Sequence, residues 1–321
     1  MTTTKVVTVT LNPALDLTGH MPNLKLGHVN LADSGSIRAA GKGVNVAKVL
    51  SELGAQVTVT GFLGKDNPTL FTQLFDDINA KDAFVRVEGA TRINVKLVEN
   101  EGRISDINFP GVEVTDSDIT RFEETLFTLA QEHEYFVIAG SLPSGVSPKL
   151  CASWIERLHQ LGKKVLFDSS RAALSEGLQA KPWLIKPNDE ELAEFVQREL
   201  TTPEECQNAA LELADKGIDN IVVSMGEQGV MWLNQDQWLF SQPPKVNVIS
   251  TVGAGDTLVA GLCWGHMQEM EKTTLLQFAT GLSAIAVTQV GVGIPSQQQL
   301  NNMIEQVSVR QINVQQTLTL K

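Results

Sequence analysis

The sequence has few of the features that mark secreted, metal-binding or membrane-inserted proteins. It contains three cysteines among 321 residues, far apart and without a CxxC pair. This spacing predicts neither a disulfide framework nor a zinc site, and it favours a reducing compartment. The sequence does not open with a basic segment followed by an apolar stretch, and no apolar run approaches the roughly 18–20 residues that span a bilayer. We therefore expect a cytoplasmic protein that does not bind membranes.

Basic residues are also in the minority. Lys and Arg number 25 against 37 Asp and Glu, which gives a formal net charge of −12. A net acidic surface repels phosphate backbones and so disfavours nucleic-acid binding. It still permits a small anionic ligand, because such a ligand responds to the local charge of its pocket. With 42% hydrophobic and 19% charged residues, the chain is expected to fold around a large core.

The chain repeats a strand followed by a helix. Proline directly after a cap residue, at Ser147, Thr202 and Asn67, predicts three helix starts. This alternation predicts an α/β fold with a doubly wound, mainly parallel sheet, formed by residues 1–321 as one domain. The site is expected at the carboxyl ends of the strands. The predicted strands are Lys5–Thr10, Gln56–Gly61, Tyr135–Ala139, Lys164–Asp168, 183–186 and Asn220–Ser224.

Residues 16–38 and 87–109 interrupt this alternation, because they contain short runs and turns but no good helix pattern. Within the second segment, residues 91–97 alternate polar and apolar side chains, as a half-exposed strand does. We expect the two segments to pair into a small β-sheet that projects from the core and serves as a lid.

A run of mostly small residues at 250–257, which contains the carboxylate Asp256, precedes an apolar helical stretch. Small residues at a helix start let a phosphate approach the backbone N–H groups closely. Asp256 would repel that phosphate, so its position makes sense if the carboxylate takes a proton from an attacking hydroxyl. Read alone, the run more often marks a glycine turn in which Asp256 caps the helix.

Three further motifs have both an ordinary and a chemical interpretation. Gly41-Lys42-Gly43 is not a Walker A loop, since Ser36 stands where that motif has glycine; alone it is a glycine turn. Arg92, Asn94 and Lys96 share one strand face, which is either solvated or a phosphate clamp. The run Lys186–Glu191 follows a strand and is either an Asn-capped helix start or a metal site.

These motifs, and their order along the chain, resemble those of the ribokinase-like carbohydrate kinases, in the phosphofructokinase B branch. The resemblance extends from Leu11-Asn12-Pro13-Ala14-Leu15-Asp16 to Thr288. It implies an ATP-dependent kinase that uses Mg²⁺ and acts on a sugar phosphate. In such a kinase, Asp256 would be the catalytic base, and the amides of Gly253, Ala254 and Gly255 would form an anion hole.

The resemblance assigns the other candidates to three groups. On the acceptor side, Gly43 and Asn45 would contact sugar hydroxyls with Lys42 close by, Asp16 would accept from a diol, Ser141 would line the pocket, and Arg92 and Lys96 would hold the existing phosphate. Asn188 and Glu191 would organise Mg²⁺. The nucleotide would lie near Lys186, Asn188, Ser224, Gly226, Gly229, Ser250, Thr251 and Val252.

Within this branch, the runs T-R-I-N-V-K at 91–96 and D-S-S-R-A-A-L at 168–174 resemble those of kinases that act on fructose 1-phosphate, and this resemblance implies that sugar as the acceptor. Fructose 6-phosphate and tagatose 6-phosphate are alternatives. A catalytically inactive regulator that binds sugar phosphates is an alternative of another class, and Asp256 argues against it. A nucleoside or unphosphorylated-sugar kinase is a third, against which Arg92 and Lys96 argue. Lids in this family often pair, so a homodimer through the lid is expected.

Overall fold

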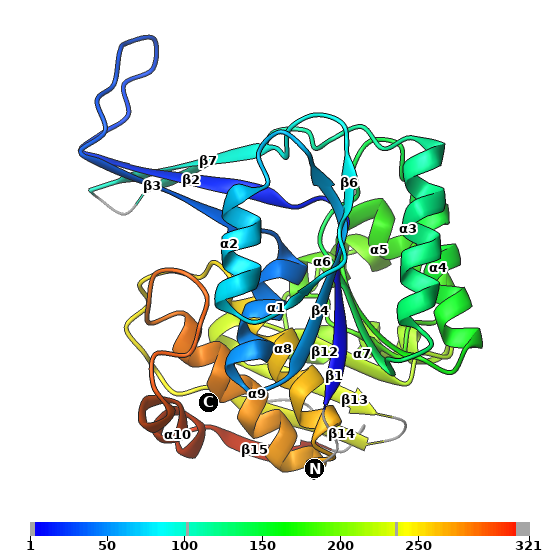
Figure 1. The fold of residues 1–321 in the computed structure, drawn as a ribbon. Helices are drawn as coiled ribbons and strands as arrows, with labels where there is room; N and C mark the ends of the chain where they lie inside the picture. The colour runs from blue at the N-terminus through cyan, green and yellow to red at the C-terminus, as the bar shows by residue number, and fades with distance from the viewer. Residues whose placement is uncertain (1–3, 101–102, 235–236, 313–321) are drawn as a thin grey trace.

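The computed structural model describes residues 4–100, 103–234 and 237–312. Within these ranges the chain forms a large, mainly parallel sheet between two layers of helices, and a separate small sheet (Figure 1). The predicted α/β fold is thereby confirmed. Parts of two predicted ranges lie outside the described residues, namely positions 1–3, 235–236 and 313–321 of the predicted domain and residues 101–102 of the predicted lid.

The large sheet has its parallel strands in the middle and antiparallel strands at one edge. In spatial order the strands are β5 (Lys81–Asp82), β4 (Gln56–Gly64), β1 (Lys5–Thr10), β9 (Tyr135–Ala139), β10 (Lys164–Asp168), β11 (Leu184–Ile185), β12 (Asn220–Ser224), β13 (Val230–Asn234), β14 (Gln237–Gln242) and β15 (Ser308–Ile312), and β6 (Val85–Val87) also pairs with β4. The pairs from β5 to β12 are parallel, whereas β13, β14 and β15 are antiparallel to their neighbours.

Apolar side chains of the parallel strands point to both faces, as burial on both sides requires. On β1, Val7 and Val9 pack into one half of the core and Val6 into the other. No helix in the described ranges is both long and apolar enough to cross a bilayer. One face is covered by α3 (Asp116–Leu129), α4 (Pro148–Gln160), α5 (Arg171–Gln179), α6 (Asp189–Val196) and α7 (Pro203–Ala214), and the other by α1 (Lys42–Glu52), α2 (Thr69–Asp77), α8 (Ala254–Met267), α9 (Lys272–Ala286) and α10 (Gln297–Glu305).

Two of the three predicted helix caps are confirmed. The side chains of Ser147 and Thr202 accept hydrogen bonds from first-turn amides of α4 and α7. The cap predicted at Asn67 is wrong, because α2 begins after Pro68 without a side-chain cap. Asn67 instead donates from Nδ2 to Thr91 O at 2.9 Å and accepts from Thr91 N at 2.8 Å. This pairing ties the start of α2 to the segment that leads into the small sheet.

The small sheet follows the carboxyl end of β1 directly and extends to one side of the core (Figure 1). Its central strands β2 and β7 are parallel, and each forms an antiparallel pair with its outer neighbour. It therefore joins two segments that are distant in the sequence. The strands, in spatial order, are β3 (Ser34–Ala40), β2 (Ala14–Met21), β7 (Ile93–Glu99) and β8 (Ile104–Ile107).

Candidate active site

Asp256 lies in the first turn of α8 and is 7% exposed. Asn45, in the first turn of α1, donates from Nδ2 to Asp256 Oδ2 at 2.7 Å. Within the described residues, the second carboxylate oxygen accepts no hydrogen bond, so it is free to bind a ligand hydroxyl. Burial raises the pKa of Asp256 to about 6, and the Asp168 carboxylate adds to this rise, while the hydrogen bond from Asn45 and the charges of Lys42 and Lys186 oppose it. A carboxylate with this pKa can take up a proton near neutral pH.

Asp168, the last residue of β10, links two lysines that come from separate motifs. Lys42 Nζ lies 3.3 Å from Asp168 Oδ2, and Lys186 Nζ lies 3.4 Å from Oδ1. Burial alone would lower the pKa of Lys42, but the charges of Asp168, Asp256 and Glu191 outweigh it and raise the pKa. The two ammonium groups beside Asp256 can donate hydrogen bonds to an anionic ligand, although the Asp168 carboxylate offsets part of their charge.

The turn before α8 is shaped to expose backbone amides. Gly253 has a φ of +84°, and a Cβ at this position would lie 2.3 Å from Val292 Cγ2, so no other residue fits without a shift. The Ala254 amide donates to Thr251 O at 3.3 Å. By contrast, the amides of Gly253 and Gly255 donate to no atom of the described chain. Two uncommitted amides at a helix N-terminus favour an anion.

The start of α1 lies directly against β1. A Cβ on Gly43 would come within 2.4 Å of Thr10 Oγ1 and 2.8 Å of Val9 O, so only glycine permits this approach. Gly41 precedes the helix with a φ of +134°, which again favours glycine. The two glycines thus fix Asn45 above the carboxyl end of the sheet.

The predicted acceptor residues of the small sheet lie together. Asp16 on β2 is opposite Asn94 on β7, whose Nδ2 donates to Asp16 Oδ1 at 3.4 Å. Burial raises the pKa of Asp16, while Lys96, the hydrogen bond from Asn94 and Arg92 oppose this rise. Lys96 also forms an ion pair with Asp106 at 3.5 Å.

The guanidinium of Arg92, predicted to help hold the existing phosphate of the sugar, bonds main-chain carbonyls of the chain. Its Nη2 donates to Asn12 O at 2.8 Å, Nε to Pro13 O at 3.3 Å and Nη1 to Phe109 O at 3.2 Å. Nη2 also reaches Ser141 Oγ at 3.4 Å. A phosphate would have to replace some of these carbonyls. Meanwhile, Asn12 holds Ser141 Oγ from the other side at 3.2 Å.

Asn188 and Glu191 form a reciprocal capping box at the start of α6. Asn188 Oδ1 accepts from Glu191 N at 2.7 Å, and Glu191 Oε2 accepts from Asn188 N at 3.0 Å. Within the described residues, Glu191 Oε1 accepts no hydrogen bond, and no cluster of three or more His, Cys, Asp or Glu side chains is suited to a metal. One free carboxylate oxygen fits Mg²⁺ that keeps its waters and binds substrate phosphates, but not a cation that needs a full protein cage.

The remaining candidates lie in two turns. Ser224 ends β12, and its amide donates to Pro187 O at 3.1 Å, next to the cap of α6. Gly229 has a φ of +113° and leaves no room for a Cβ, which would lie 2.3 Å from Ser241 O. The candidates that are exposed or half-exposed in these turns are Gly226, Ser250, Thr251 and Val252.

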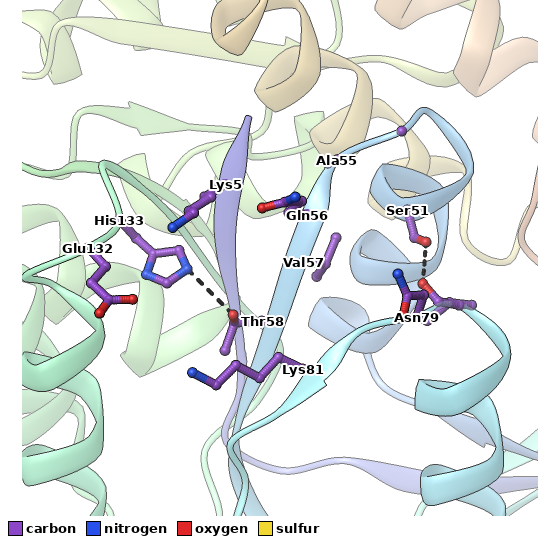
Figure 2. A pocket seen from close by; sticks show the side chains of 12 residues that line it. Lys5, Ser51, Ala55, Gln56, Val57, Thr58, Asn79, Lys81, Glu132 and His133 are labelled. Atoms are coloured by element: carbon purple, nitrogen blue, oxygen red, sulfur yellow. Dashed lines mark hydrogen bonds between the residues drawn. The ribbon is translucent and has the colours of Figure 1, made fainter. Parts of the chain in front are cut away.

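A cavity of about 550 Å³ lies away from all these residues. It opens beside the first residues of β1 and β4, at the opposite end of the strands from Asp256, and Lys5, Lys81 and His133 converge on it (Figure 2). None of the predicted site residues lines it. This cavity therefore does not coincide with the candidate site, at which charged groups and free amides converge.

The model of the pfkB family of carbohydrate kinases matches residues 5–299. The chain belongs to this family. The kinase is 67% identical to 1-phosphofructokinase of Vibrio cholerae over 307 residues, which cover 96% of this chain and 97% of the relative. It is 44% identical to 1-phosphofructokinase of Escherichia coli, over 96% of this chain and 99% of the relative. Phosphofructokinase-2 of Escherichia coli, solved with fructose-6-phosphate, superposes with a TM-score of 0.85 at 27% identity, over 94% and 98% of the two chains.

Sequence reasoning did not select Asp168 as a site residue of this kinase. Its signal was present, because it is the carboxylate that ends a predicted buried strand, and ligands bind outside the carboxyl ends of parallel strands. Asn12 was likewise treated only as part of a motif, although its side chain fixes Ser141. Asp168 and Asn12 contact other side chains of the candidate site that are distant in the sequence. The spacing of residues within a local motif does not reveal such contacts.

Proposed function

We propose that this kinase transfers the γ-phosphoryl group of ATP to fructose 1-phosphate and forms fructose 1,6-bisphosphate. The observation that carries the proposal is the 67% identity, over nearly both whole chains, with 1-phosphofructokinase of Vibrio cholerae. The buried Asp256, bonded by the half-buried Asn45 and beside two lysines and two free amides, supports the chemistry that such a transfer needs.

Asp256 acts as the base in this proposal. Its free oxygen accepts the proton of the primary hydroxyl at carbon 6, and that hydroxyl oxygen forms a bond to the γ-phosphorus. The bond from this phosphorus to the oxygen bridging it to the β-phosphorus breaks, and ADP leaves with the bridging oxygen. The amides of Gly253, Ala254 and Gly255, with Lys42 and Lys186, stabilise the charge on the transferred group. Positioning and electrostatics then supply most of the rate.

The acceptor lies under the small sheet, which serves as the lid. Lys96 holds the 1-phosphate, and Arg92 joins it when its guanidinium exchanges a main-chain carbonyl for a phosphate oxygen. The hydroxyls of the ring are held by Asp16, Gly43, Asn45 and Ser141, which come from both the small sheet and the core.

The nucleotide lies along the turns after β11, β12 and before α8. Glu191, through its free oxygen, and Asn188 would hold Mg²⁺ through its waters. When bound, the metal neutralises charge on the phosphates of ATP. The nucleotide contacts assigned to this side are Lys186, Asn188, Ser224, Gly226, Gly229, Ser250, Thr251 and Val252.

We also propose a homodimer formed through the small sheet, in the cytoplasm, where ATP is available. Phosphofructokinase-2 of Escherichia coli has been solved in a tetrameric inhibited form, which shows that a family member can assemble. Isolated apolar residues are ordinary on a surface, but a group of them in one small sheet favours an interface. The exposed apolar side chains in and next to this sheet include Leu17, Ile37, Ile93, Ile104, Ile107 and Phe109.

The test of the substrate is a set of initial rates with MgATP and fructose 1-phosphate, fructose 6-phosphate or tagatose 6-phosphate. We expect the highest kcat/KM with fructose 1-phosphate. The anomeric hydroxyl lies beside carbon 1, so the two fructose phosphates present displaced hydroxyls to the same pocket, and the preference is smaller than the roughly 10⁴–10⁵-fold seen when a hydroxyl is missing. A higher kcat/KM with another sugar phosphate would overturn the proposed acceptor but not the assignment as a kinase. No ADP release with any sugar phosphate favours the inactive regulator.

A further inference from the structure

Two residues near the end of α1 hold a loop that comes from the far end of the sequence. Glu52 Oε2 accepts a hydrogen bond from Ile294 N at 2.6 Å. Lys48 Nζ donates to Val292 O and lies 3.1 Å from Glu52 Oε1. The ion pair of Lys48 and Glu52 therefore holds the segment 292–294 through two hydrogen bonds, one to the carbonyl of Val292 and one from the amide of Ile294.

The loop that they hold packs against the turn before α8. The position that a Cβ of Gly253 would occupy lies 2.3 Å from Val292 Cγ2, so the Val292 side chain covers Gly253 directly. A Cβ on Gly293, which lies between the two bonded residues, would come within 2.6 Å of Lys48 Nζ and displace this ammonium group. Gln289 Nε2 donates to Gly293 O at 2.6 Å and holds the loop from the other side.

We infer that Lys48 and Glu52 are positioning residues for the proposed anion hole. They fix the loop at 292–294, Val292 fixes Gly253 in its left-handed conformation, and the direction of the Gly253 amide follows. The inference rests on the proposed role of this amide. It gives α1 two separate tasks, because Asn45 at its beginning orients Asp256 and the ion pair at its end orients the amide.

The expected effect falls on turnover and hardly on stability. Lys48 and Glu52 are 33% and 31% exposed, and ion pairs of such exposure contribute little to the stability of a fold. An oxyanion-hole donor, in contrast, contributes about 10²–10³-fold to kcat. Partial loss of its orientation should lower kcat by about 10–100-fold, while the KM values for sugar and ATP change by less than about threefold, because the amide acts on charge that develops during transfer.

The experiment compares Lys48→Met and Glu52→Gln with Lys48→Arg, measuring kcat, both KM values and the thermal midpoint. Lys48→Arg keeps a cation that can bond both Glu52 and the Val292 carbonyl, and it should restore most of the lost kcat. Arg86→Met is the matched control. Arg86 forms an i,i+4 ion pair with Asp82 at 32% and 26% exposure and also donates to a carbonyl, Phe84 O, at 3.2 Å.

A double-mutant cycle with Val292→Ala tests the intermediate step. If Lys48 acts through Val292, Lys48→Met should cost much less kcat in a Val292→Ala background than in the wild type. Additive losses, or a kcat for both Lys48→Met and Glu52→Gln that matches Arg86→Met, overturn the inference. Should Lys48→Met fail to fold, Glu52→Gln and Val292→Ala decide by the same criteria.

The outcome is separable from that of the proposed function. If Asp256→Asn abolishes turnover while Lys48→Met and Glu52→Gln leave it unchanged, only the positioning role fails. If Asp256→Asn retains full turnover, the proposed active site fails, and the positioning role fails with it.

Discussion

Asn45 and Asp256 are 211 positions apart in the sequence, yet 2.7 Å separates Asn45 Nδ2 from Asp256 Oδ2. The bond joins the first turns of α1 and α8 and holds the carboxylate in one orientation. It uses a single oxygen of Asp256 and leaves the other to the incoming hydroxyl. The pair is therefore a natural starting point for tests of the proposed chemistry.

Replacing Asp256 by Asn should nearly abolish turnover, because the amide keeps the shape of the carboxylate but cannot take up the proton. General-base catalysis contributes about 10²–10⁴-fold. Steady-state kcat and nucleotide affinity by calorimetry are the measurements, and affinity should be largely retained. A variant that keeps more than about a third of wild-type kcat would show that Asp256 is not the base.

The pH dependence should report the same carboxylate. Asp256 must be ionised to accept a proton, so kcat/KM should fall as the pH drops through its raised pKa of about 6. The hydrogen bond from Asn45 lowers that pKa, so Asn45→Ala should move the acid limb to higher pH. The position of the limb is independent of any loss of sugar affinity in this variant. A limb that stays in place, or moves to lower pH, contradicts the assignment.

Lys96→Met should weaken binding of the sugar phosphate and leave the KM for ATP nearly unchanged. A charge-assisted contact is worth about 1.5–3 kcal/mol, which corresponds to roughly a 10–150-fold loss of kcat/KM for the sugar. Asp106→Asn is the companion variant, because it releases Lys96 from its ion pair and should not cause this loss. If Lys96→Met lowered kcat/KM for ATP as much as for the sugar, Lys96 would not belong to the sugar-phosphate site.

Glu191→Gln should raise the Mg²⁺ concentration that gives half-maximal activity. Glutamine at this position can still close the capping box, so α6 should remain folded. Glu205 occupies the equivalent position in the capping box of α7, and Glu205→Gln is therefore the matched control. Identical Mg²⁺ titrations for the two variants would remove Glu191 from the surroundings of the metal.

Strands buried on both faces were readily predicted from the sequence. Continuous apolar runs identified β1, β9, β10 and β12 with their observed bounds, because such runs have few other stable arrangements. At Asn67 the prediction failed, since a side chain that can cap a helix can equally bond a distant backbone such as Thr91. Whether such a side chain caps a helix depends on which distant residues lie beside it in the fold, and a single sequence does not show these contacts.

The candidate site was predictable to the extent that its residues stand in local runs. Asp256 and the glycines before it are adjacent, so their pattern was visible. The bridge from Asp168 to Lys42 and Lys186 brings three separate segments together and was not. Arg92 was predicted to share a strand face with Asn94 and Lys96, but it precedes β7, and its carbonyl partners depend on how three chain segments meet.

Arg92 bonds the carbonyls of Asn12, Pro13 and Phe109, which belong to the connections between the small sheet and the core. Under the proposed function, one guanidinium therefore bridges the two connections about which the lid would move. A phosphate that draws this group away must loosen the hinge as it binds. Sugar affinity and lid mobility would then share one coupling free energy. A substitution that strengthens the bonds between Arg92 and these carbonyls would weaken sugar-phosphate binding by the same factor by which the bound sugar weakens the bonds.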